Sequence, residues 1–234
     1  MKRILDNNEA KRTPLDVTNI NEKVYSLIKE RITNLEYPPG YKIVVPRLQA
    51  ELGVSNSPIK SALFRLAGEE LVEITSRKGT IVKDISKSDI LEIEEFRTII
   101  EIGAVDILAR IITKEQITIL EQLYQETLFS NCDFNYSEFM KKDSLFHIEI
   151  IKMTGNNRLL NAYKRLNAHI QLVRFQATRK PIKPLPWTNM DHMAIIDALK
   201  MNDPIKSMHV IKDHRRKAQN AFMAKRKKRS NKKD

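Results

Sequence analysis

Residues 53–66 read GVSNSPIKSALFRL, and this stretch is the feature of the sequence from which the fold of its surroundings can be predicted. Its apolar residues recur with the three- and four-residue spacing of one helical face: Ile59, Ala62, Leu63 and Leu66. Ser57 and Pro58 precede this pattern, where a serine caps a helix and a proline fits its first position. The remaining polar side chains point outward: Asn56, Lys60, Ser61 and Arg65. The stretch therefore predicts a short amphipathic helix with a polar outer face.

The residues around this helix, 19–85, predict one compact unit. An apolar helical face runs from Val24 to Leu35 before the chain meets Pro38, and a short helix over 46–52 is broken at Gly53. Branched residues at 71–74 and 80–85 indicate two strands, joined by the glycine-containing turn 75–79. Three helices followed by a hairpin are the order of a winged helix-turn-helix.

The chain after Ser86 is helical almost throughout, and six helices with short links predict an antiparallel bundle. Thr113 with Gln116 forms a capping box, and Asp203 before Pro204 starts the last helix. The three prolines of 180–187 predict a loop. The fold class is therefore mostly α. We expect a flexible arm (1–18), a winged helix-turn-helix (19–85), an all-α bundle (86–224) and a basic tail (225–234).

Composition narrows the class of protein. Of the 234 residues 41% are hydrophobic, enough to bury a core, yet no apolar run approaches the ~20 residues that span a bilayer. The single cysteine, Cys132, excludes an internal disulfide framework. We expect a cytoplasmic protein without a secretory signal.

The net charge of +12 is concentrated at the end of the chain. Residues 215–234 hold ten Lys and Arg against one Asp. Such a tail holds DNA phosphates without sequence preference, but a solvated basic end accounts for it equally well.

The motifs resemble one family of bacterial transcription regulators. PPG (38–40), LGVSNSPIKSALFRL (52–66) and KGTIV (78–82) resemble the GntR DNA-binding domain. The later motifs resemble the FadR-type (FCD) effector domain: FRTIIE (96–101), DSLFHIEI (143–150), TGNNRLL (154–160) and DHMAIIDAL (191–199). The resemblance implies a palindromic DNA operator, a homodimer and a small-molecule effector.

The resemblance also implies which residues contact DNA. The family has arginines at three places where this sequence has Pro46 followed by Arg47, Asn56 and Lys60. Since lysine and asparagine do not reproduce the forked contact of arginine, we expect an operator unlike the family's usual one. The predicted DNA-binding residues are Arg47, Ser55, Asn56, Ser57, Lys60, Arg65, Lys78 and Gly79.

Four residues are candidate metal ligands. Asp143 and His147 are four residues apart on one helical face, and His192 and His214 lie on later helices that a bundle brings together. Their match to the FadR-type pattern implies a divalent metal, with Zn, Ni, Fe and Mn all compatible. A buried hydrogen-bonded network without metal is the alternative.

Two further residues are candidate effector contacts. The resemblance places Arg97 at a pocket, where it pairs with the carboxylate of a small acid; a salt bridge to Glu101 is the alternative. Asn157 is either a helix cap or part of the pocket wall. We expect His169 and His209 to be structural or exposed, and Trp187 to cover the pocket or anchor its loop.

Three functions compete. A ligand-responsive, dimeric transcription regulator accounts for both parts of the chain. A metal-dependent hydrolase lacks a second carboxylate as general base and a Gly-x-Ser-x-Gly motif, so we expect no enzyme. A non-specific architectural DNA binder would act through the basic tail alone.

Overall fold

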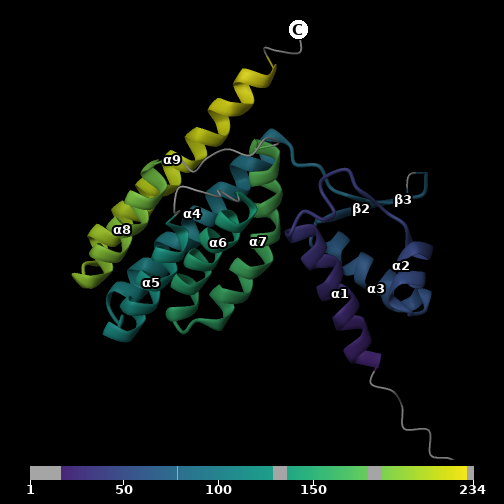
Figure 1. Ribbon diagram of the computed structural model, residues 1–234, viewed down its shortest axis with the longest axis horizontal. Helices are drawn as coiled ribbons and strands as arrows, with labels where there is room; N and C mark the ends of the chain where they lie inside the picture. Colours follow the sequence, from purple (N-terminus) through teal and green to yellow (C-terminus); the bar gives the residue numbers. More distant parts are fainter. Residues whose placement is uncertain (1–16, 78, 129–135, 179–185, 231–234) are drawn as a thin grey trace, which may run out of the picture.

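The computed structural model describes residues 17–77, 79–128, 136–178 and 186–230, which form nine helices and a three-stranded sheet. Two groups of elements are visible in Figure 1, with the N-terminal group on the right. No helix within the described ranges is long and apolar enough to cross a membrane.

The N-terminal group is the expected winged helix-turn-helix. Its helices are α1 (Val17–Thr33), α2 (Val45–Leu52) and α3 (Asn56–Gly68), and its wing is β2 (Val72–Thr75) with β3 (Gly79–Val82). A third strand, β1 (Lys42–Ile43), was not predicted, because two residues carry no periodic signal. It pairs antiparallel with β3, so the strand order is β1-β3-β2.

The first predicted helix ends earlier than expected. The sequence pattern continues toward Pro38, but α1 ends at Thr33. Leu35 adopts the left-handed conformation with φ 64°, which a continuing α-helix does not allow. The amide of Tyr37 then bonds back to the carbonyl of Arg31, which closes the turn.

The predicted start of α3 was also wrong. The N-cap residue is Ser55, not Ser57, and its side chain makes no capping hydrogen bond. Pro58 is therefore the third helical residue, where its missing N–H still costs no helical bond. The turn before α3 is made by Gly53, which ends α2 with φ 62°.

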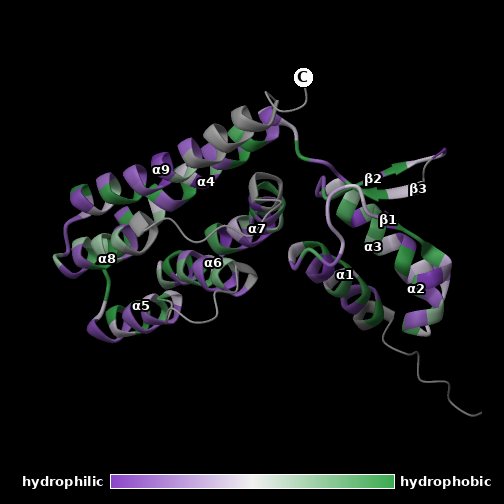
Figure 2. Cartoon of the chain, turned by 45° about the horizontal axis from the view of Figure 1, so that its top comes forward, coloured by the Kyte–Doolittle hydropathy of each residue, from purple (hydrophilic) through white to green (hydrophobic). Residues whose placement is uncertain are grey.

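The C-terminal group has the six expected helices. They are α4 (Lys87–Ala109), α5 (Lys114–Thr127), α6 (Tyr136–Met153), α7 (Asn157–Thr178), α8 (Pro186–Lys200) and α9 (Pro204–Ser230). The capping box of Thr113 with Gln116 is confirmed, as is the cap of Asp203 on the Lys206 amide. Figure 2 shows α4 and α9 running side by side.

Two predicted boundaries in this group need correction. Asn156, not Asn157, caps α7, because its Oδ1 accepts from the amides of Arg158 and Leu159. Helix α8 begins at Pro186, inside the predicted loop, since a proline fits the first helical position. The last helix runs into the basic tail, as the sequence predicts: α9 continues to Ser230.

Helix α7 belongs to both hydrophobic cores. Tyr163 and Ile170 are buried in the core of the bundle. Ala168, Leu172 and Val173 are buried in the core of the winged group, together with residues of α1 and α3. The two groups therefore share a packed helix rather than a flexible linker.

Candidate nucleic-acid interface and metal centre

The outer face of α3 and the start of α2 are free to meet a partner. Five of the predicted DNA contacts are exposed: Arg47, Ser55, Asn56, Ser57 and Lys60. The opposite face of α3 is buried by the apolar stripe that the sequence predicted. The second helix of the helix-turn-helix therefore presents polar side chains outward, as a base-reading helix does.

Arg65 points elsewhere. Its Nη1 lies 2.5 Å from Oε2 of Glu22, and its guanidinium lies 3.5 Å from the centre of the Tyr25 ring. Both partners belong to α1, so the side chain of Arg65 connects α3 with α1. The other predicted DNA contacts of α3 point outward instead. Of the remaining candidates, Gly79 is exposed at the wing with φ 78°, and Lys78 lies outside the described residues.

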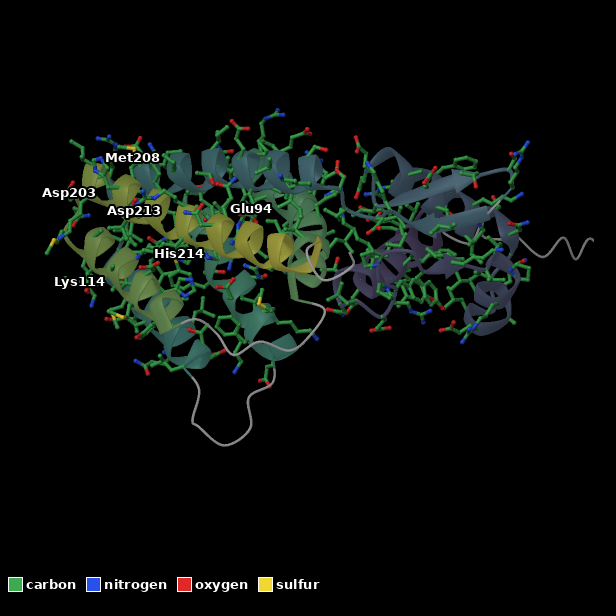
Figure 3. All side chains as sticks on the ribbon, turned by 90° about the horizontal axis from the view of Figure 1, so that it is seen from above. Glu94, Lys114, Asp203, Met208, Asp213 and His214 are labelled. Carbon is green, nitrogen blue, oxygen red and sulfur yellow. The ribbon has the colours of Figure 1, made fainter. Side chains whose placement is uncertain are left out.

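Three imidazoles converge inside the bundle. His147 of α6, His192 of α8 and His214 of α9 are at most 3% exposed, and one ring nitrogen of each lies within 4.8 Å of those of the others. The ring of Phe146 stacks on His192 at 4.4 Å between centroids and supports its orientation. Figure 3 shows His214 on α9 beside α4, which carries Glu94.

The fourth predicted ligand, Asp143, lies beside this cluster. Its Oδ1 is 3.3 Å from Nε2 of His192 and 4.0 Å from Nε2 of His147, while Oδ2 accepts from Arg174. Burial alone raises the pKa of Asp143, but Arg174 and the imidazoles outweigh burial and hold the pKa well below its usual value. Asp143 is therefore an ionised, oriented oxygen donor.

Two carboxylates that the sequence did not point to lie behind the imidazoles. Oε2 of Glu101 is 3.3 Å from Nδ1 of His147, and Oδ2 of Asp191 is 3.4 Å from Nδ1 of His214. A carboxylate on one ring nitrogen fixes the ring and makes the other nitrogen a better ligand. Spacing did not predict that these two carboxylates contact the histidines, because each reaches its histidine from another helix.

The protonation of the rings suits metal binding. Burial lowers the pKa of His147 to about 4 and lowers that of His214 as well. Both rings are thus neutral at pH 7 and keep a lone pair for a ligand.

Whether a metal fits this site can be judged from the hydrogen bonding of the buried ring nitrogens. Neither ring nitrogen of His147 or His192 makes a well-formed hydrogen bond, although all four are buried. Buried polar groups in proteins are normally paired, so a hydrogen-bonded network without metal leaves this site incomplete. Three imidazoles and a carboxylate are a donor set for Zn²⁺ and the neighbouring transition metals.

Arg97 forms the salt bridge that was one of its two predicted alternatives. Its Nε donates to Oε1 of Glu101 at 2.6 Å and to the hydroxyl of Tyr163 at 3.2 Å, so the salt bridge exists. Its Nη1 is nevertheless buried without a hydrogen-bond partner. Arg215, which the sequence did not point to, also has an unpartnered Nε in this region, with Nη2 3.5 Å from Glu94.

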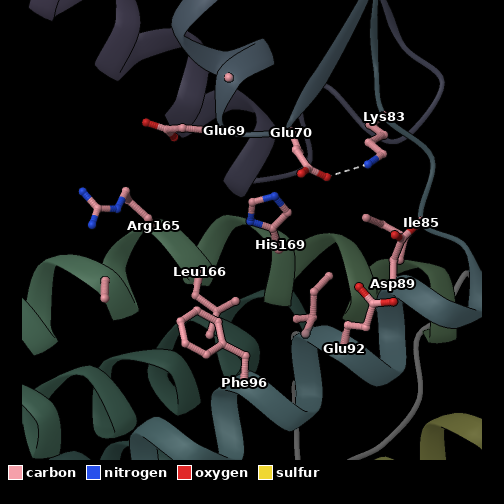
Figure 4. Close-up of a pocket in the computed structure, with 13 residues that line it drawn as sticks. Glu69, Glu70, Lys83, Ile85, Asp89, Glu92, Phe96, Arg165, Leu166 and His169 are labelled. Carbon is pink, nitrogen blue, oxygen red and sulfur yellow. Dashed lines mark hydrogen bonds and ion pairs between the residues drawn. The ribbon is translucent and has the colours of Figure 1, made fainter.

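The other candidate residues do not belong to the cluster of His147, His192 and His214. Asn157 and His209 are exposed, and the side chain of Trp187 lies outside the described residues. A pocket of about 420 Å³ opens where the end of α3 and Lys83 face α4 and α7. His169 lies in it, near the Glu70–Lys83 ion pair (Figure 4). None of the four predicted ligands lines this pocket.

Comparisons with known proteins agree with this arrangement. Residues 20–82 match the profile of the family described as bacterial regulatory proteins, gntR family, and residues 92–217 match the FCD domain. The chain is 27% identical to the Nta operon transcriptional regulator of Aminobacter aminovorans over 59% of this chain and 66% of that protein. It is 22% identical to the transcriptional repressor RspR of Escherichia coli, over 79% and 80% of the two chains. The solved structure of Escherichia coli McbR/YncC shares the fold, with a TM-score of 0.76 at 17% identity over 88% of this chain and 97% of that one.

Proposed function

Because this chain belongs to the GntR family of bacterial regulatory proteins and carries an FCD domain, it is a DNA-binding transcriptional regulator and not an enzyme, and we propose that a site for a metal ion and a small carboxylic acid controls its affinity for DNA. In this proposal a homodimer binds a palindromic operator through α3, the start of α2 and the wing. A divalent transition metal and a small carboxylic acid bind inside the bundle and alter the affinity for DNA.

The observation that carries the proposal is the convergence of three buried imidazoles, two of which have ring nitrogens that make no well-formed hydrogen bond. His147, His192 and His214 would hold the metal, with Asp143 as the oxygen ligand. The metal would supply a fixed positive charge and open coordination positions for an anionic oxygen.

The charges around the site favour an acid as effector. Three arginines and four carboxylates are buried here, and the Nζ of Lys217 lies 2.6 Å from one of these carboxylates, Asp191, so the formal charges of this set cancel: Arg97, Arg174, Arg215, Lys217, Glu94, Glu101, Asp143 and Asp191. A divalent ion adds two positive charges to a site of low dielectric constant, where uncompensated charge is costly. A carboxylate offsets one of these two charges, and the Nη1 of Arg97, which has no hydrogen-bond partner, is a donor for it.

Helix α7 supports a route from this site to the DNA-binding domain. Arg174 of α7 binds Asp143, while the adjacent Leu172 and Val173 pack in the core of the winged group. A ligand that moves α6 against α7 would therefore shift the winged group as well. Such a shift changes the distance between the two reading helices of a dimer, which must match the operator half-sites.

An exposed apolar stripe on α4 supports dimerisation. Phe96, Ile99 and Ile107 follow one another at helical spacing and are 48%, 62% and 37% exposed. A second copy of this chain packing on the stripe would bury it.

One experiment tests the proposal as a whole. The full-length protein is purified without chelator, and native mass spectrometry reports its metal, any co-purified acid and its oligomeric state. Selection from random-sequence duplexes then identifies the preferred DNA, and its affinity is measured with a panel of small carboxylic acids. We expect bound metal, a dimer, a palindromic site and one acid class that changes affinity only in the metal-loaded protein. Protein that binds no metal and responds to no acid would contradict the proposal.

A further inference from the structure

Phe64 is an anomaly on the reading face of α3. It is 65% exposed, whereas its neighbours Leu63 and Leu66 are buried. Asn56, Lys60 and Phe64 occupy every fourth position of the helix, so the three side chains follow one another along a single face. Phe64 therefore lies on the surface that the polar residues of α3 present outward.

The structure gives Phe64 no role in packing. The next residue, Arg65, turns toward Glu22 and Tyr25 of α1 and leaves the outer face to Phe64. The other exposed side chains of this face are small or polar, among them Ser57 and Ser61. An exposed phenylalanine that the fold does not need is available to a partner.

The chemistry of the major groove identifies that partner. A phenylalanine ring has no hydrogen-bond donor or acceptor, so it cannot read amide, amino or carbonyl groups of a base. Among the base edges in the major groove only thymine presents an apolar group, its C5-methyl. The second helix of a helix-turn-helix lies in that groove with its N-terminal residues against the base edges, and Phe64 lies on the same face two turns beyond Asn56, which is at that end of α3.

We infer that Phe64 reads a thymine methyl group in each half-site of the operator. This inference rests on the proposed operator binding and adds to it a specificity-determining residue. Asn56 and Lys60 supply the polar contacts on the same face, and Phe64 adds an apolar one a turn further along the helix. The operator consequently contains a thymine at a fixed distance from the bases that Lys60 contacts.

Replacing single thymines by deoxyuridine tests this contact, because the replacement removes only the methyl group. The preferred site is first obtained by selecting random duplexes with the full-length protein. Each thymine of one half-site is then replaced in turn, and the affinities of the wild-type protein and of Phe64→Ala are measured. We expect one position where the replacement weakens wild-type binding about fourfold, the effect of exposing one buried methyl group. At that position the same replacement leaves the affinity of Phe64→Ala unchanged, since the two changes remove one interaction.

Ile205→Ala is the matched control, because Ile205 is also 65% exposed but lies at the start of α9. It should show the wild-type response at every thymine. Equal responses of Phe64→Ala and the wild-type protein at all thymines would overturn the inference. A change of oligomeric state in Phe64→Ala, with unaltered base preference, would overturn it too and assign Phe64 to a protein interface. If no sequence is enriched at all, the proposed function itself fails, which is a different result.

Discussion

The Oδ1 atom of Asp143 lies 3.3 Å from the Nε2 atom of His192, while the second oxygen of the same carboxylate accepts a hydrogen bond from Arg174. Arg174 therefore holds the carboxylate ionised and directs one oxygen toward the imidazoles. Arg174 lies on α7, whose Leu172 and Val173 pack in the core of the winged group, so this helix connects the candidate metal centre with the DNA-binding domain.

Asp143→Asn should weaken metal binding while the bundle stays folded. The amide keeps the size of the side chain but removes its negative charge, and we expect the affinity for Zn²⁺ to fall by at least about tenfold. Competition with a chromogenic chelator measures this affinity. Asp213→Asn, an exposed aspartate on α9, is the control and should bind as the wild type does. Equal affinities of all three proteins would leave Asp143 as a structural partner of Arg174 alone.

Removing the metal should destabilise the protein. A ligand that binds only the folded state contributes about 3 kcal/mol when its concentration is a hundred times the dissociation constant. Thermal unfolding of the full chain with and without chelator measures the difference as a lower melting temperature. The double variant His192→Ala with His214→Ala should show no such difference, whereas His209→Ala, whose side chain is exposed, should respond like the wild type. A chelator effect that persists in the double variant would place the metal elsewhere.

The helices and their caps could be predicted because their signals lie in neighbouring residues. The site could be predicted only in part, because it depends on contacts between residues that are far apart in the sequence. The capping box at Thr113 and the cap at Asp203 involve neighbouring residues, so the sequence contains the whole signal. The strand β1 has two residues and exists only because β3 lies beside it. The four predicted ligands came from a family pattern. The part that Glu101, Arg174 and Arg215 play at the site was missed, since nothing in their local sequence says that they meet inside a bundle.

Lys60→Ala should weaken binding to the selected operator more than binding to random DNA. A lysine that contacts a base is worth about 1–3 kcal/mol at its own site and little elsewhere, whereas the loss of a phosphate contact weakens binding to all sequences about equally. Fluorescence anisotropy at fixed salt measures both affinities. Lys212→Ala, an exposed lysine on α9, controls for the removal of one positive charge. The same weakening on both DNAs would remove Lys60 from the base-reading residues.

Ile99→Asp should separate the dimer into monomers. Ile99 is the most exposed residue of the apolar stripe on α4, and a charge buried in an apolar interface is costly. Light scattering coupled to size-exclusion chromatography measures the mass in solution. Ile205→Asp places the same charge at a site of similar exposure on α9 and should remain dimeric. A dimeric Ile99→Asp protein would direct the search for the interface to another helix.

Deleting residues 225–234 should distinguish a regulator with a basic helix from an architectural DNA binder. The deletion removes seven Lys and Arg, five of which lie in the helical part of the segment before Ser230. For each phosphate that is no longer neutralised, the slope of the logarithm of affinity against the logarithm of salt concentration becomes shallower by about one. We expect a shallower slope and weaker binding on random DNA, with the preference for the selected operator retained, because α3 and the wing are intact. If the shortened protein binds neither DNA, the tail supplies the affinity and the architectural alternative holds. If operator preference and slope both stay unchanged, the basic end of α9 is a solvated terminus that does not touch DNA.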